Sequence, residues 1–231
     1  MTSRDTACRP EALVDFRAAL PMLAQTRGLV LAATAIARHE LASADGPATW
    51  ARLVAIAARI RSRVHSPDPQ ALLAHAHDEL FSVEGYAGAK DDYHAPANSY
   101  LPTVIARRRG IPIALCLVYK AVLGEIDIEV QGIGAPGHFL ARVEVEGVPA
   151  FVDPFHGGAV LSTDEAYARV EQVLGYKVHR EPNVLAVADP VSWLRRMLRN
   201  LEGTFAQSHR DRDRHAMQEL AFELEARRGG D

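Results

Sequence analysis

The sequence predicts an α+β protein in which a central buried helix and an antiparallel sheet lie between flanking helices. Three observations predict this class. Apolar residues recur at helical spacing through residues 10–64. Residues 113–123 are then apolar on nearly every side, which is typical of a helix wrapped by other elements. After them, apolar and polar residues alternate between residues 126 and 153, as in strands with one buried face.

The N-terminal region, residues 1–66, is expected to form a helical lobe. Gly28 and the segment SADGP at residues 43–47 are expected to break it into separate helices. The third helix, over residues 49–64, has an inward apolar face made by Leu53, Ile56, Ala57 and Ile60. Cys8 precedes these helices, in a polar segment that is expected to be loose.

The central region, residues 67–162, is expected to contain the core of the fold. Asp68 and Pro69 are suited to begin a helix, as the cap and the first helical residue. That helix carries His75 and His77, which point to different faces because residues two apart on a helix do not meet. We therefore interpret both as surface histidines rather than as a metal pair.

A long polar loop at residues 83–96 follows this helix. Loops of this length in a compact domain are often functional, so Tyr93 and His94 are candidate substrate-binding residues at the rim of a site. The alternative is that the loop is a plain surface connection. Asn98 or Ser99 is expected to cap the next helix.

The central helix is expected to begin at Pro112, which suits the first helical position and follows the break at Gly110. Strands are expected at residues 126–130, 138–145 and 150–153, with a turn at residues 146–149. The C-terminal region, residues 163–231, returns to helical spacing and is expected to end in a helical hairpin. The three regions are expected to form one compact unit.

The composition indicates a soluble globular protein. Hydrophobic residues make up 48% of the chain and charged residues 24%, and a net charge of −3 gives no basic field that would capture nucleic acid. Two cysteines are too few for a disulfide framework, and no apolar run is long enough for a bilayer. The first residues lack the pattern of a secretory signal. We expect a cytoplasmic protein without cofactor, membrane or nucleic-acid partner; a protein or peptide is the partner to consider, and the oligomeric state is left open.

Cys116, His138 and Asp153 are the candidate catalytic residues. A thiol nucleophile needs a base that takes its proton and a third group that orients the base. His138 and Asp153 fall on neighbouring expected strands, where side chains lie about 5 Å apart. The alternative for Cys116 is a buried structural thiol, because an apolar helix raises a thiol pKa. The alternative for His138 is a ring that only bonds Asp153 or a carbonyl group.

His156, in the segment DPFHGG, is a further candidate for the same pocket and is assigned to substrate binding. His138, Asp153 and His156 include residue types that ligate metals. Because no dense ligand motif accompanies them, no metal is predicted.

Three segments together resemble the SirB1 family, whose central region is a transglutaminase-like, papain-related domain: GYAGAKDDYHAPANSYLPTVIARRRGIPIALCLVY, GIGAPGHFLARV and FVDPFHGG. The resemblance runs from about residue 80 to residue 158. It implies a helix-then-sheet core, an ancestral Cys-His-Asp triad with His138 and Asp153 on the histidine and aspartate positions, and a tetratricopeptide-like hairpin at the C-terminus. Such enzymes carry their cysteine two residues after a glycine, where this chain has Pro112 after Gly110.

The resemblance leaves two functions to test. In the first, Cys116 is the nucleophile, His138 the base and Asp153 the orienting group of an acyl transferase or amide hydrolase. In the second, the fold is a catalytically inactive scaffold or regulatory module whose cleft binds a protein or peptide. The second predicts a Cys116 buried beyond reach of His138 and an exposed apolar patch near Trp193.

Overall fold

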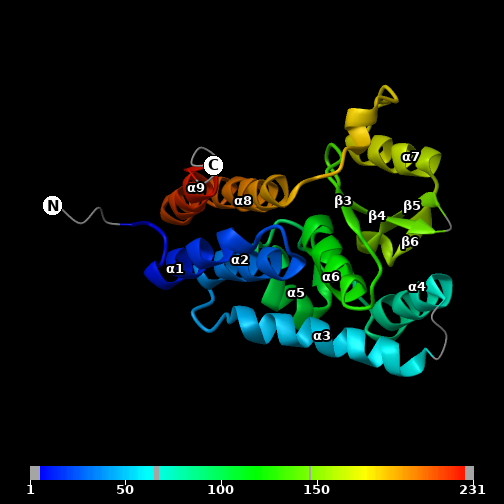
Figure 1. The fold of residues 1–231 in the computed structure, drawn as a ribbon. Coiled ribbons are helices and arrows are strands. Elements are labelled where there is room, and N and C mark those ends of the chain that lie inside the picture. Colours follow the sequence, from blue (N-terminus) through cyan, green and yellow to red (C-terminus); the bar gives the residue numbers. More distant parts are fainter. Residues whose placement is uncertain (1–5, 65–67, 146, 227–231) are drawn as a thin grey trace.

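The computed structural model describes residues 6–64, 68–145 and 147–226 (Figure 1). The helices before the central one are α1 (Pro10–Ala19), α2 (Thr26–Arg38), α3 (Gly46–Arg63), α4 (Pro69–His77) and α5 (Leu101–Arg107). The central helix is α6 (Pro112–Gly124), and α7 (Thr163–Leu174), α8 (Pro190–Gln207) and α9 (Asp211–Ala226) follow the sheet. This mixture of helices and small sheets confirms the predicted α+β class.

Four strands form the main sheet, in the order β3 (Gln131–Ile133), β4 (Leu140–Val145), β5 (Val148–Asp153) and β6 (Ala159–Leu161). Each neighbouring pair is antiparallel, and Ala141 of β4 pairs with Val152 of β5. A second, two-stranded sheet pairs β1 (Ala87–Gly88) with β2 (Arg109–Gly110) in parallel. The alternating sequence between residues 138 and 153 therefore does form an antiparallel sheet.

Helices cover both faces of the main sheet. The central helix α6 contacts β4 on one face and is buried along almost its whole length, as its apolar sequence predicts. Helix α7 contacts β5, and a second apolar cluster that includes Leu140, Phe151 and Val170 fills the space between them. In Figure 1, α8 and α9 lie beside α1 and α2, away from α7. Both ends of the described chain thus meet through the contact of α9 with α1.

Several N-terminal predictions need correction. Gly28 does not break the chain but lies inside α2, where an added Cβ would stand 2.0 Å from the carbonyl oxygen of Met22. Cys8 is not in a loose segment: it is buried, because Glu219 of α9 accepts hydrogen bonds from the backbone N–H groups of Ala7 and Cys8, each over 2.9 Å.

Other local predictions were also wrong. Neither Asn98 nor Ser99 caps α5, which begins after Tyr100 without a side-chain cap. His77 is not a plain surface residue, since its Nε2 lies 2.8 Å from the hydroxyl of Tyr119 on the central helix. Trp193 itself is buried, so its indole is not part of the exposed apolar patch that the second function predicts on the helical hairpin.

The strand expected at residues 126–130 begins later, at Gln131. The backbone N–H groups of Ile126 and Ile128 donate to the carbonyl of Leu123, so these residues form the turn that ends α6. Asp127 between them has a left-handed φ of 63°. The turn expected at residues 146–149 includes Glu146, which lies outside the described residues.

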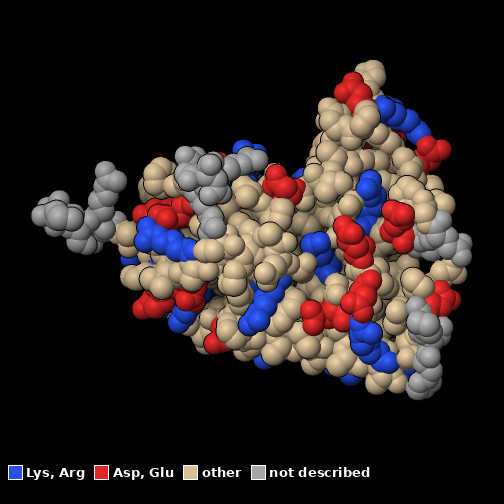
Figure 2. All heavy atoms as spheres, viewed as in Figure 1, with Lys and Arg blue, Asp and Glu red and all other residues tan. Residues whose placement is uncertain are grey.

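Charged side chains of both signs are interspersed on the face of the molecule that Figure 2 presents. Several of them form surface ion pairs, such as Arg63 with Asp78 and Arg108 with Glu84. Among the described helices, none is long and apolar enough for a membrane span.

Candidate functional site

The candidate site centres on Asp153, the last residue of β5. Its side chain is fully buried, and its Oδ1 accepts a hydrogen bond from the backbone N–H of His156 over 3.3 Å, which begins a short 3-10 turn. His138 lies in the bend between β3 and β4, and its Nε2 is 3.0 Å from Oδ2 of Asp153. The antiparallel pairing of β4 with β5 places the two side chains together, as the sequence predicts.

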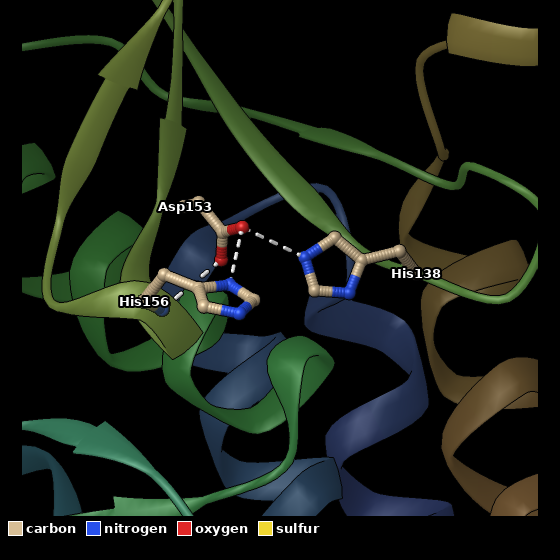
Figure 3. A group of neighbouring side chains, drawn as sticks. All are labelled: His138, Asp153 and His156. Carbon is tan, nitrogen blue, oxygen red and sulfur yellow. Dashed lines mark hydrogen bonds and ion pairs between the residues drawn. The ribbon is translucent and has the colours of Figure 1, made fainter. Parts of the chain in front are cut away.

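Two further groups reach the same carboxylate oxygen. Nδ1 of His156 lies 2.8 Å from Oδ2 of Asp153, and Nη1 of Arg169 on α7 donates to it over 2.6 Å. Figure 3 shows the imidazole rings of His138 and His156 approaching the carboxylate from different sides. Burial alone would raise the pKa of Asp153, but hydrogen bonds and charge from His138 and His156 outweigh it and hold that pKa below its usual value.

His156 is partly exposed, so it forms the outer wall of this cluster. Its pKa is lowered, because burial disfavours the imidazolium more than the nearby Asp153 carboxylate favours it. The ring is therefore neutral at pH 7 and can exchange hydrogen bonds with a bound molecule.

Cys116 occupies the second turn of α6 and is 0% exposed. Its Sγ donates a hydrogen bond to the carbonyl of Phe139, at 3.6 Å, and Phe139 directly follows His138. Burial, together with the negative charge of Asp153, raises the pKa of the thiol well above its usual value. In the described structure the thiol thus meets the backbone beside His138 and makes no hydrogen bond with the imidazole itself.

Tyr93 and His94 lie on the loop that crosses the site. The Tyr93 ring contacts the Phe155 ring at 5.9 Å between centroids, and Phe155 in turn stands edge-on to the His138 ring at 6.2 Å. Tyr93 is 38% exposed, so it covers Phe155 from the solvent side, and the ring of His94 contacts Tyr93. Tyr93 therefore approaches the cluster through Phe155.

Sequence reasoning missed two arginines of the site. Arg169 lies on an amphipathic helix, where charged residues usually face solvent, so no local signal marks it. Arg196 of α8 donates to the carbonyl oxygens of Ala135 and His138, over 2.7 and 2.8 Å, and so fixes the bend that carries His138. The segment RRMLR, which contains Arg196 and two further arginines, was a weak sequence signal for a basic group at this site.

The ligand-type atoms of His138, Asp153 and His156 all lie within 4.8 Å of one another, which is a spacing that a metal ion can bridge. However, Oδ2 of Asp153 already accepts from Arg169, whose fixed positive charge would repel a cation at that oxygen. The cluster fits a carboxylate that orients two imidazoles better than it fits a metal centre.

The comparison with protein families decides the assignment of this fold. A family model described as the transglutaminase-like superfamily matches residues 48–199. The chain belongs to the transglutaminase-like superfamily. Its matched region includes the central helix, the main sheet and every candidate residue of the site.

The chain is similar to several curated proteins. A UPF0162 protein of Xylella fastidiosa (strain 9a5c) is 33% identical over 190 residues, which are 80% of this chain and 68% of the relative. A UPF0162 protein of Pseudomonas aeruginosa is 32% identical over 122 residues, 52% of this chain and 43% of that protein. F-box only protein 21 of Homo sapiens is 28% identical over 130 residues, 53% of this chain and 20% of that protein. No solved structure matches significantly.

Proposed function

We propose that this chain is a binding module on a transglutaminase-like fold, and that it holds a protein or peptide without performing thiol chemistry. The observation that carries this proposal is the environment of Cys116, whose sulfur is fully buried and bonded to a backbone carbonyl. A thiol reacts as its thiolate and must be accessible to a substrate. The raised thiol pKa and the missing access both oppose that role.

The surroundings of Asp153 support the same proposal. In a catalytic triad the carboxylate orients one imidazole, which is then free to take a proton. Here the same carboxylate oxygen of Asp153 also forms hydrogen bonds with Arg169 and His156. The carboxylate therefore joins β5 to α7. Such a fully bonded buried carboxylate stabilises the fold whether or not any chemistry takes place.

Among the comparisons, the similarity to F-box only protein 21 is the one that favours a protein partner. The segment similar to F-box only protein 21 makes up 20% of that relative, so it stands there as one part of a longer chain. For the present chain we propose membership of the SirB1 family, a cytoplasmic location and a protein or peptide partner. The proposed regions remain residues 1–66, 67–162 and 163–231, the last being tetratricopeptide-like.

A second candidate function is acyl transfer or amide hydrolysis by Cys116, His138 and Asp153. Its support is that the imidazole Nε2 is held by Asp153, which leaves Nδ1 as the nitrogen for proton transfer. The sulfur also contacts the residue next to His138. This function requires the bend at His138 to move, so that the sulfur reaches both the imidazole and the solvent.

Thiol labelling separates the two candidates. In a Cys8→Ser background, Cys116 is the single cysteine, and iodoacetamide at neutral pH should leave the folded protein unmodified by intact mass. The same protein should react fully once unfolded in guanidinium chloride, which serves as the positive control. Rapid labelling of the folded protein that disappears in a His138→Gln variant would contradict the binding-module proposal and favour the enzyme.

A further inference from the structure

A cavity of about 500 Å³ lies on the other side of the bend that carries His138. Its walls come from residues 134–139, from the connection at residues 186–188 and from the first three turns of α8. A volume of this size suits a small ligand or a few residues of a peptide. Because Arg196 binds the carbonyl of His138 and also lines the cavity, the cavity and the candidate site share one structural support.

The charged side chains that line the cavity are all basic. Arg195, Arg196 and Arg199 line it, and none of the described lining residues is an aspartate or glutamate. Arg195 already pairs with Glu225 on α9. Among the described residues, no carboxylate lies within ion-pair distance of Arg196 or Arg199, although the charge of Arg199 acts on Glu202 one turn further along α8. A guanidinium without an ion-pair partner favours a carboxylate or phosphate ligand, and Arg199 can bind one through two parallel hydrogen bonds.

Arg196 is held in place before any ligand arrives. Two of its nitrogens donate to backbone carbonyls, and its guanidinium lies 5.6 Å from the centre of the Phe139 ring. Burial lowers the pKa of this guanidinium. The neighbouring Tyr93 and Cys116 act in the opposite direction, but their effect on the pKa is smaller. A fixed, partly desolvated cation attracts an anion more strongly than a solvated one does.

The connection at residues 186–188 offers a backbone edge beside these arginines. It pairs with β3 through Gly134 N–H to Ala186 carbonyl and Ala188 N–H to Gly132 carbonyl. Antiparallel geometry then turns the N–H and carbonyl of Val187 to the opposite side, where no described residue bonds them. Val187 is 50% exposed, so this edge can accept an additional strand.

We infer that this cavity binds an acidic peptide segment, with its backbone added along Val187 and its carboxylates placed on Arg196 and Arg199. The inference deepens the proposed binding role and rests on it. Pro136 and Phe139 supply an apolar wall, which a single inorganic anion would not use but alternate side chains of a strand would. The backbone edge likewise favours a peptide over a free phosphate.

Fluorescence anisotropy tests the inference with a short labelled peptide that alternates glutamate and valine, and with a matched peptide carrying glutamine for glutamate. The full-length protein should bind the glutamate peptide, more weakly at high salt, and should not bind the glutamine peptide. Arg199→Ala should weaken binding about tenfold, and Arg199→Glu should abolish it. The Arg199 side chain is exposed on α8 and its interaction with Glu202 is at the surface, so both variants should stay folded.

The matched control is Arg212→Ala, which removes an exposed arginine of α9 outside the cavity and should leave the affinity unchanged. Hydrogen exchange at the Val187 amide should slow when the peptide binds. Equal binding to the Arg199→Glu protein, or no protection of that amide, would overturn the inference. So would calorimetry in which inorganic phosphate binds in an Arg199-dependent way while the peptide does not. Thiol inertness of Cys116 is measured without any peptide, so the proposed function can stand or fail separately.

Discussion

Nη1 of Arg169 donates to Oδ2 of Asp153 across 2.6 Å, which joins the middle of α7 to the last residue of β5. The carboxylate is fully buried, whereas the arginine side chain is 17% exposed. Since His138 and His156 bond the same oxygen, the position of α7 and the orientation of both imidazoles depend on one carboxylate.

Replacing Arg169 tests this dependence. Arg169→Met should lower the free energy of unfolding by about 2–4 kcal/mol, because a buried carboxylate loses its cationic partner. The control is Arg180→Met, which removes an exposed ion pair with Asp164 of α7 and a contact over the Tyr167 ring. Its free energy of unfolding should stay close to that of the wild type. Urea unfolding of both variants measures the difference, and equal losses would contradict the role given to Arg169.

Acid should destabilise the protein through His77. Burial lowers the pKa of this imidazole below 6.5, so the folded state keeps it neutral while the unfolded state takes up a proton first. The stability it contributes is present above its unfolded pKa and is lost as pH falls through the lowered folded pKa. As the pH is lowered from about 6.5, the free energy of unfolding should therefore decrease, and it should decrease less steeply in the His77→Gln variant. Parallel pH profiles for the two proteins would disprove this.

Gly132 should tolerate no side chain. A Cβ there would stand 2.1 Å from Cζ3 of Trp193, so Gly132→Ala should separate β3 from α8 and cost about 2–3 kcal/mol in thermal or urea unfolding. Gly203, inside α8, has nothing within 4 Å of its added Cβ. Gly203→Ala should instead stabilise the protein by about 0.5–1 kcal/mol, because alanine is the better helix former. A stable Gly132→Ala protein would contradict the packing of Trp193.

The N-terminal residues should depend on Glu219. Burial, and then the negative charge of Glu219, raise the pKa of the Cys8 thiol to about 12. In a Cys116→Ala background, Glu219→Ala should release Ala7 and Cys8 from α9 and make Cys8 reactive toward iodoacetamide. Glu223→Ala on the same helix removes an ion pair with Arg17 and should leave Cys8 protected. No gain in labelling would show that apolar packing alone holds this segment.

Local sequence patterns predicted those elements that a single local feature determines, such as an apolar run or a capping residue. The central helix follows from an apolar run after Pro112, and Asp68 caps α4 as its position indicates. The strand expected at residues 126–130 was wrong because Ile126 is buried by the turn after α6 rather than by a sheet. Burial alone produced the alternating pattern there.

The sequence by itself determined that a buried central helix precedes an antiparallel sheet, and that His138 and Asp153 come together on neighbouring segments of that sheet. These depend on residue spacing, which local geometry converts into structure. Only the tertiary structure decided that the Cys116 sulfur faces the Phe139 carbonyl, and that Arg169 and Arg196 reach the same neighbourhood from α7 and α8. Those contacts join residues distant along the chain, so their geometry depends on how whole elements pack rather than on any neighbouring residue.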